Sequence, residues 1–135
     1  MNKNNHINIG KLGENIACAY LSKNGYKLVE RNVNMKWGEI DIIAINTEKI
    51  LTFIEVKTIK IKTFADVDNS AKLCISPENN LTKSKFIKLQ KCAQYYANNH
   101  PNFIYKDKGY EIDLIAILIN EKENYKVNYY ENIFI

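Results

Sequence analysis

The sequence predicts an α/β protein in which a central mixed sheet is flanked by helices, with the elements in the order α-β-β-β-α-β-β. Two segments repeat apolar residues at helical spacing, and five others are short runs rich in β-branched and aromatic residues. Three of these strand-like runs carry apolar residues on both faces, as strands do when a sheet is covered on both sides. These runs span residues 39–45, 50–58 and 112–119.

Length and charge narrow the class of protein. A chain of 135 residues predicts one domain, spanning residues 1–135, with a hydrophobic core that needs no disulfide or metal support. The formal net charge of +4 makes the chain mildly basic, which is compatible with a nucleic-acid partner but does not establish one. Arg31 is the only arginine. This scarcity argues against a module that reads bases through bidentate arginine–guanine contacts.

The cysteines and the hydropathy pattern indicate a compartment. Cys18, Cys74 and Cys92 are widely spaced and form no CxxC pair, which is typical of reduced intracellular thiols. The first ten residues lack the apolar core of a signal peptide. The longest apolar run, Leu114–Ile119, is too short to cross a bilayer. We therefore expect a soluble cytoplasmic protein with no membrane partner.

The first half of the chain predicts one helix and three strands. Apolar and small residues recur at helical spacing from Ile7 to Asn24. Gly13 lies on this apolar face, where the lack of a side chain permits a close approach to a neighbouring element. Strands are predicted over Tyr26–Val33, Glu39–Ile45 and Ile50–Thr58. The last two are joined by a short polar connection and should form an antiparallel hairpin.

The second half opens with a polar segment, Lys60–Leu81, that has no sustained period and is predicted to be a long loop. Thr82 is placed to cap a helix with one apolar face, and Pro101 lies just beyond the end of that helix. Two further strands are predicted over Gly109–Ile119 and Val127–Ile135.

Two of the predicted strands carry nearly the same seven residues, EIDIIAI at Glu39–Ile45 and EIDLIAI at Glu111–Ile117. Only the first copy is followed by a strand with a Glu-x-Lys sequence, at Glu55 and Lys57. Side chains alternate along a strand, so these two residues share one face. We therefore assign the chemistry to the first copy, and to Asp113 of the second copy a structural role as a hydrogen-bonded carboxylate at a strand end.

A regular hairpin would bring carboxylates of the two strands together. The register that fits best sets Asp41 opposite Glu55, Glu39 opposite Lys57, Ile43 opposite Phe53 and Ile45 opposite Leu51. Carboxylates at that distance repel each other unless a proton or a cation lies between them. Mg²⁺ is the predicted cation, with the backbone carbonyl of Val56 as a third ligand. Lys57 would neutralise a phosphate oxygen or orient the attacking water.

An Asp followed on the next strand by Glu-x-Lys resembles the PD-(D/E)xK nuclease superfamily. Further segments resemble the YraN-like family of predicted endonucleases, in order and over essentially the whole chain. They are Gly10-x-x-Gly13-Glu14-x-x-Ala17, Gly38–Asp41, Ile54–Thr58, Lys85-x-x-Lys88-Leu89, Ile112–Ala116 and Glu131–Phe134. The chain departs from the pattern at Ile40, where the superfamily has Pro, and at Ile59-Lys60, where relatives often carry Arg.

The resemblance implies a restriction-endonuclease-like fold, similar to that of archaeal Holliday-junction resolvases. It implies that Asp41 and Glu55 bind the metal, that Lys57 is the catalytic lysine, and that Glu14 reaches the site from the first helix. The implied activity is hydrolysis of DNA phosphodiester bonds with Mg²⁺ or Mn²⁺, including branched DNA. An enzyme that cuts junctions would be a homodimer, because its substrate presents two equivalent strands.

Other interpretations of the same residues stay open. Glu14 fits a solvent-facing helix position as well. Lysines on the second helix would either follow a phosphate backbone or simply be solvated. These lysines are Lys83, Lys85, Lys88 and Lys91. The protein as a whole would fit a module that holds branched or single-stranded DNA without cutting it, or an interaction subunit that keeps only the fold.

Overall fold

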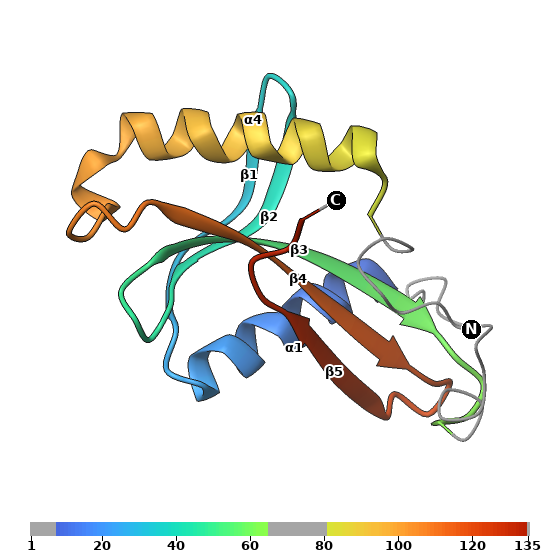
Figure 1. Ribbon diagram of the computed structural model, residues 1–135. Coiled ribbons are helices and arrows are strands. Elements are labelled where there is room, and N and C mark those ends of the chain that lie inside the picture. Colours follow the sequence, from blue (N-terminus) through green and yellow to red (C-terminus); the bar gives the residue numbers. More distant parts are fainter. Residues whose placement is uncertain (1–7, 65–80, 135) are drawn as a thin grey trace.

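The structure is a computed structural model, and it describes residues 8–64 and 81–134 (Figure 1). Along the chain the elements are α1 (Ile9–Lys23), β1 (Lys27–Met35), β2 (Gly38–Ile45), β3 (Leu51–Lys60), α4 (Lys83–Asn99), a short 3₁₀ turn (Pro101–Phe103), β4 (Tyr110–Ile119) and β5 (Tyr125–Tyr130). The predicted order of helices and strands is therefore confirmed within the described residues. Most of the predicted loop, residues 65–80, lies outside them.

The five strands form one mixed sheet in the order β1-β2-β3-β4-β5. Neighbouring strands are antiparallel except for β3 and β4, which run parallel and are connected through α4. Helix α1 covers one face of the sheet and α4 covers the other, as Figure 1 shows. The α/β architecture with a central mixed sheet flanked by helices is thus as predicted.

Each helix buries a separate apolar cluster against the sheet. On the α4 side, Phe53 of β3 packs with Phe86 and Leu89 of the helix. On the α1 side, Ile54, the next residue of β3, packs with Leu21. Successive residues of the strand thus serve opposite cores, which explains why the central strands are apolar on both faces.

The helix caps follow the sequence signals. The Thr82 side chain accepts a hydrogen bond from the backbone N–H of Lys85 at 3.1 Å, which confirms Thr82 as the N-cap of α4. The Asn8 side chain does the same for α1 through the N–H of Lys11. Capping satisfies backbone donors that the first helical turn leaves without partners.

The last strand is shorter than predicted and begins earlier. It ends at Tyr130, and Asn132 adopts φ of 46°, in the left-handed region. The chain then turns across the start of β4, where the N–H of Ile133 donates to the carbonyl of Ile112 at 2.8 Å. Ile133 is buried in the α4-side cluster. Burial of this side chain by the turn, rather than a continued strand, accounts for the difference.

The β1–β2 hairpin changes face part-way along its length. Ile42 packs on the α1 side, whereas Ile40 packs on the α4 side, although residues two apart in a regular strand share a face. On β1, Asn32 has φ of 51° in the left-handed region. The paired residues of this ladder flank Asn32 and Asp41 but do not include them. Asp41 therefore lies at the point where the side chains of the hairpin change from one face of the sheet to the other.

Two of the three cysteines and the helices α1 and α4 lie within the described residues. Cys18 and Cys92 are buried free thiols, and Cys74 lies outside the described residues. In the parts of the chain that the structure describes, neither helix has the length and apolar content needed to cross a membrane.

Candidate metal centre

The predicted register of β2 and β3 is correct in the core and fails at the site. Ile43 pairs with Phe53 and Ile45 with Leu51, as expected. The ladder stops at Ile42, so the expected pairs of Asp41 with Glu55 and of Glu39 with Lys57 do not form. The carboxylate of Asp41 instead accepts the backbone N–H of Val56, through Oδ2 at 2.9 Å.

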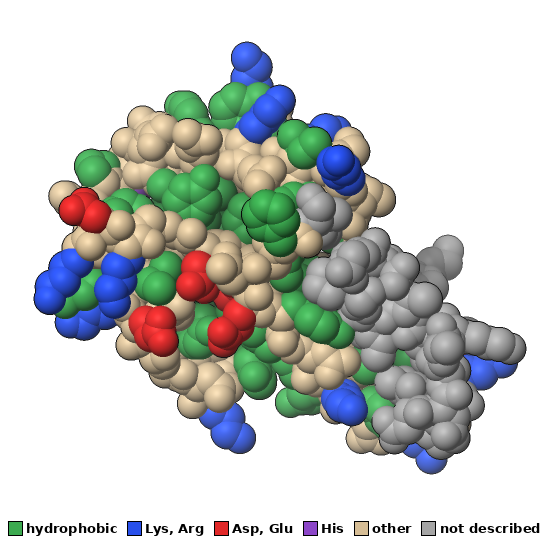
Figure 2. All heavy atoms as spheres, viewed as in Figure 1, with side chains coloured by type: hydrophobic (Ala, Val, Ile, Leu, Met, Phe, Trp, Pro, Cys, Tyr) green, Lys and Arg blue, Asp and Glu red, His purple; other side chains and the backbone are tan. Residues whose placement is uncertain are grey.

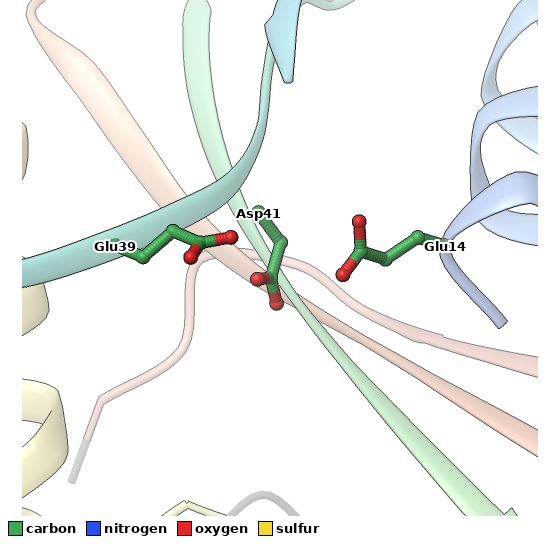
Figure 3. Close-up of side chains that lie close together, drawn as sticks. All are labelled: Glu14, Glu39 and Asp41. Atoms are coloured by element: carbon green, nitrogen blue, oxygen red, sulfur yellow. The ribbon is translucent and has the colours of Figure 1, made fainter. Parts of the chain in front are cut away.

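Three carboxylates lie close together at the point where the β1–β2 hairpin changes face. Glu14 comes from α1, and Glu39 and Asp41 come from β2; Figure 3 shows their side chains pointing toward one another. One oxygen of each lies within 4.8 Å of the others. Glu14 thus lies beside Glu39 and Asp41, although it belongs to a helix far from β2 in the sequence.

Neighbouring polar groups hold Glu14 and Glu39 in place. The Asn32 amide nitrogen donates to Glu14 Oε1 and to Glu39 Oε1, both at 2.8 Å. Arg31 lies 3.8 Å from Glu14 and donates to the Asn15 side chain at 2.8 Å. The left-handed backbone at Asn32 places its amide between the two carboxylates, so the change of face in the hairpin has a function in building the site.

Asp41 interacts with both Glu14 and Glu55, and so connects the two parts of the site. It is half-buried, and burial together with the nearby Glu55 raises its pKa to about 7. Glu14 raises it further, while the hydrogen bond from Val56 acts in the opposite direction. Neighbouring carboxylates that resist ionisation form a site where the binding of a cation is strongly favoured.

Glu55 forms the second end of the site. It is 5% exposed, and its Oε1 lies 2.5 Å from Nζ of Lys85 on α4. Burial alone would lower the pKa of Lys85, but the hydrogen bond and attraction to Glu55, with a further contribution from Asp41, raise it above its ordinary value. Lys85, predicted as a DNA-binding residue, is therefore also a partner of the predicted metal ligand.

Close packing of α1 on β3 fixes the position of Glu14. Gly13, the residue before it, is buried, and a Cβ added there would lie 1.8 Å from Oγ1 of Thr58. A glycine lets the helix approach β3 closely enough to present Glu14 to Asp41. The predicted close approach at Gly13 is confirmed, and Thr58 is the neighbour.

The remaining predicted residues are exposed cations. Lys57 lies on β3 two residues after Glu55, and its side chain reaches solvent. On α4 the other predicted DNA-binding residues are exposed as well, namely Lys83, Lys88 and Lys91. Figure 2 shows lysine side chains gathered over the end of α4 at which the helix begins.

Three residues of the site were missed or misplaced by sequence reasoning. The sequence predicts Glu39 on the same face as Asp41 and opposite Lys57, but assigns it no part in the metal site. Asn32 carries no periodic signal, because its role depends on a left-handed backbone. The contact of Lys85 with Glu55 depends on how α4 crosses the sheet, which the sequence does not indicate.

The donor set fits a hard divalent cation. Every ligand atom offered is a carboxylate oxygen, the type that Mg²⁺ and Mn²⁺ prefer. Oxygens that share one Mg²⁺ at about 2.0–2.1 Å lie at most about 4.2 Å apart. Neighbouring oxygens around an octahedral ion lie only about 2.9 Å apart, so the three carboxylates, within 4.8 Å of one another, would need to approach by up to about 2 Å through side-chain rotation.

The second EIDxIAI copy is built differently. Asp113 is 1% exposed and accepts hydrogen bonds from the Tyr129 hydroxyl and, at 2.8 Å, from the backbone N–H of Asn132. Burial raises the pKa of Asp113, and these two donors counteract the rise. Its carboxylate is thus used inside the fold, in agreement with the predicted structural role.

Replacement of Asp113 by Asn should destabilise the protein by roughly 1–3 kcal/mol, because the amide nitrogen would face a group that donates a hydrogen bond. The free energy of unfolding from urea denaturation measures this effect. Tyr129→Phe is the matched variant and should destabilise less, since the Asn132 contact survives. A free energy of unfolding unchanged by Asp113→Asn would contradict the structural role.

Comparison with known proteins places the chain in a family. The profile of the "Uncharacterised protein family UPF0102" matches residues 13–117, which include Glu14, the hairpin, β3 and most of β4. This range contains every carboxylate of the site.

Individual relatives match over most of their lengths. A UPF0102 protein of Campylobacter concisus is 37% identical over 119 residues, covering 87% of this chain and 88% of the relative. One from Syntrophomonas wolfei is 32% identical, covering 93% and 96%. One from Caldanaerobacter subterraneus is 36% identical, covering 99% and 100%. The chain belongs to the UPF0102 family.

Proposed function

We propose that this protein is a metal-dependent endonuclease of the restriction-endonuclease-like fold that hydrolyses phosphodiester bonds in DNA. The observation that carries the proposal is the convergence of carboxylates from three elements: Glu14, Glu39 and Asp41 lie within 4.8 Å of one another, and Asp41 also interacts with Glu55 of β3. Burial, together with the nearby Glu55, raises the pKa of Asp41 to about 7, so ionised carboxylates here are costly to the metal-free fold, and a cation-binding function explains their presence.

Each residue has a role in this proposal. Asp41 and Glu55 would hold Mg²⁺ or Mn²⁺, with the Val56 carbonyl as a third ligand and Glu14 as an additional carboxylate. When bound, the metal would supply an activated water and neutralise charge at phosphorus. Lys57, exposed at the same strand, would interact with a phosphate oxygen of the substrate.

Lysines on α4 would hold the DNA. Lys83, Lys88 and Lys91 are exposed along one helix that also delivers Lys85 to the site. A row of cations beside a metal centre would position a phosphate backbone so that one phosphate reaches the carboxylates. The proposed substrates include branched or otherwise structured DNA, and cleavage of a four-way junction would require a homodimer.

A second function is favoured by one contact. Lys85 already neutralises Glu55 at 2.5 Å, so this carboxylate is compensated without a metal. A protein that binds DNA with this lysine face and does not cleave it would keep the same fold and the same surface cations. The two functions differ in whether the carboxylates bind a cation.

Incubation with linear, flapped and four-way DNA in Mg²⁺, Mn²⁺ or EDTA tests the nuclease directly. Cleavage should require the metal, and calorimetry should show weak binding of Mn²⁺ to the wild type and none to the Asp41→Ala, Glu55→Ala double variant. Equal binding of Mn²⁺ by the wild type and the double variant would show that Asp41 and Glu55 are not the metal ligands. DNA binding without cleavage in any metal would leave the second function.

A further inference from the structure

A groove lies beside the carboxylates, between the tip of the β1–β2 hairpin and α4. Its volume is about 270 Å³. Trp37 and Glu39 line it from the hairpin, and Lys85 and Lys88 line it from the helix. Glu55 also contributes to its lining. The groove is therefore continuous with the candidate metal centre, because Glu39 and Glu55 belong to both.

An aromatic ring stands in this groove. Trp37 is half-buried, and its indole meets the ring of Tyr95 with centroids 5.7 Å apart and an interplanar angle of 67°. At that angle Tyr95 supports the indole without lying flat against it. Tyr95 itself is 54% exposed. The hairpin and the helix thus present two aromatic side chains next to each other, and Trp37 also packs against the edge of the α4-side core.

The two lysines of the groove differ in their ion pairing within residues 8–64 and 81–134. Lys85 is engaged with Glu55 at 2.5 Å, whereas Lys88, one turn further along α4, is exposed and forms no ion pair among the described residues. A lysine in this state offers its charge to an anion. The groove therefore combines an aromatic ring, an ammonium group that forms no ion pair within the described residues, and a connection to the carboxylates.

We propose that this groove binds an unpaired nucleotide next to the phosphate that is cleaved, so that the substrates are DNA molecules with a single-stranded segment, such as flaps and frayed branches. The base stacks on Trp37, and its phosphate binds Lys88. In a fully paired duplex the bases are stacked inside the helix and offer no free face to the indole. The position of the cleaved phosphate rests on the proposed nuclease function, whereas binding of the unpaired nucleotide does not.

Trp37 is the only tryptophan of the chain, so its fluorescence tests the proposal without cleavage. The wild-type protein in EDTA at low ionic strength is titrated with a DNA hairpin that carries a five-thymidine tail, and with the same hairpin ending bluntly. The tailed DNA should quench the fluorescence and bind at least about 5-fold more tightly, since stacking on an aromatic side chain contributes roughly 5- to 160-fold per base.

Variants of the groove identify the contacts. Trp37→Leu and Lys88→Ala should each reduce the affinity of the protein for the tailed hairpin, measured by the anisotropy of labelled DNA. Each variant should therefore show a smaller ratio between its affinities for tailed and blunt DNA. Lys91→Ala is the comparison, because Lys91 lies on the same helix outside the groove; it should weaken both DNAs by a similar factor. Because Lys88 is exposed, its variant keeps the test valid if Trp37→Leu does not fold.

Equal affinity for the two hairpins, or equal quenching by the blunt one, would overturn the groove proposal. Its failure is separable from that of the nuclease proposal. Metal-dependent cleavage of blunt duplex without any preference for a tail would refute only the groove. Tail-specific quenching with no cleavage in any metal would refute only the nuclease.

Discussion

Asp41→Asn should reduce metal-dependent DNA cleavage by orders of magnitude while leaving the protein folded. Asparagine keeps the shape of the side chain and can still accept the N–H of Val56 through its carbonyl oxygen, a contact of 2.9 Å in the wild type. It removes the negative charge that would hold the cation beside Glu14 and Glu55. Initial cleavage rates on flapped DNA in Mg²⁺ measure the effect per folded molecule.

The same variant should be more stable than the metal-free wild type at neutral pH. The folded protein holds the Asp41 proton up to about pH 7, whereas an unfolded chain releases it near 3.8. Between these values the folded state binds more protons, so the wild type loses stability as pH rises. The difference in pKa sets an upper limit of about 4 kcal/mol on this loss. Thermal melting in EDTA from pH 4 to pH 8 should show the decline for wild type and a flatter profile for Asp41→Asn.

Asp113→Asn and Lys57→Met are the controls for this result. Asp113 is used within the fold, so its variant should lose stability and keep its activity per folded molecule. Lys57→Met should keep metal binding and lose cleavage, because Lys57 is proposed to contact the substrate and not the cation. If Asp113→Asn abolished cleavage while Asp41→Asn left it intact, the chemistry would belong to the other EIDxIAI copy.

The parts of the fold that the sequence predicted are those governed by local rules. Alternation of apolar residues set the register of β2 and β3 correctly through Ile43 and Phe53, where both faces are buried. The cap at Thr82 follows from the hydroxyl's ability to accept a backbone N–H. The close approach at Gly13 follows from a small residue on an apolar helix face.

The site departs from these rules at one point. Extending the regular ladder past Ile42 predicts that Asp41 pairs directly with Glu55. That pair does not form, because the alternation of side chains predicts the register only where the backbone is regular. The left-handed backbone at Asn32 and the change of face in the hairpin interrupt this regularity. Contacts such as that of Lys85 with Glu55 depend on the crossing of α4 over the sheet, and no local pattern encodes that crossing.

Gly13→Ala should destabilise the protein and displace Glu14 from the site. The added methyl group would lie 1.8 Å from Oγ1, 3.0 Å from Cβ and 3.2 Å from Cγ2 of Thr58. Rotation of the threonine would move Oγ1 and Cγ2 but not Cβ, which is fixed to the β3 backbone and stays within 3.0 Å of the new methyl group. Helix α1 must therefore move away from the sheet. Overpacking of this kind costs roughly 3 kcal/mol, more than the helix propensity of alanine returns.

Loss of function should exceed what the loss of stability explains. At a temperature where Gly13→Ala remains folded, its affinity for Mn²⁺ and its cleavage rate should both fall, because Glu14 follows directly after the displaced residue. Thr58→Ala removes Oγ1 and Cγ2, the atoms that meet the new methyl group on two sides. Combined with Gly13→Ala it should restore part of both stability and metal affinity, and a double-mutant cycle by urea denaturation and calorimetry measures that coupling. If the two substitutions were simply additive in both quantities, contact between Gly13 and Thr58 would not be what positions Glu14.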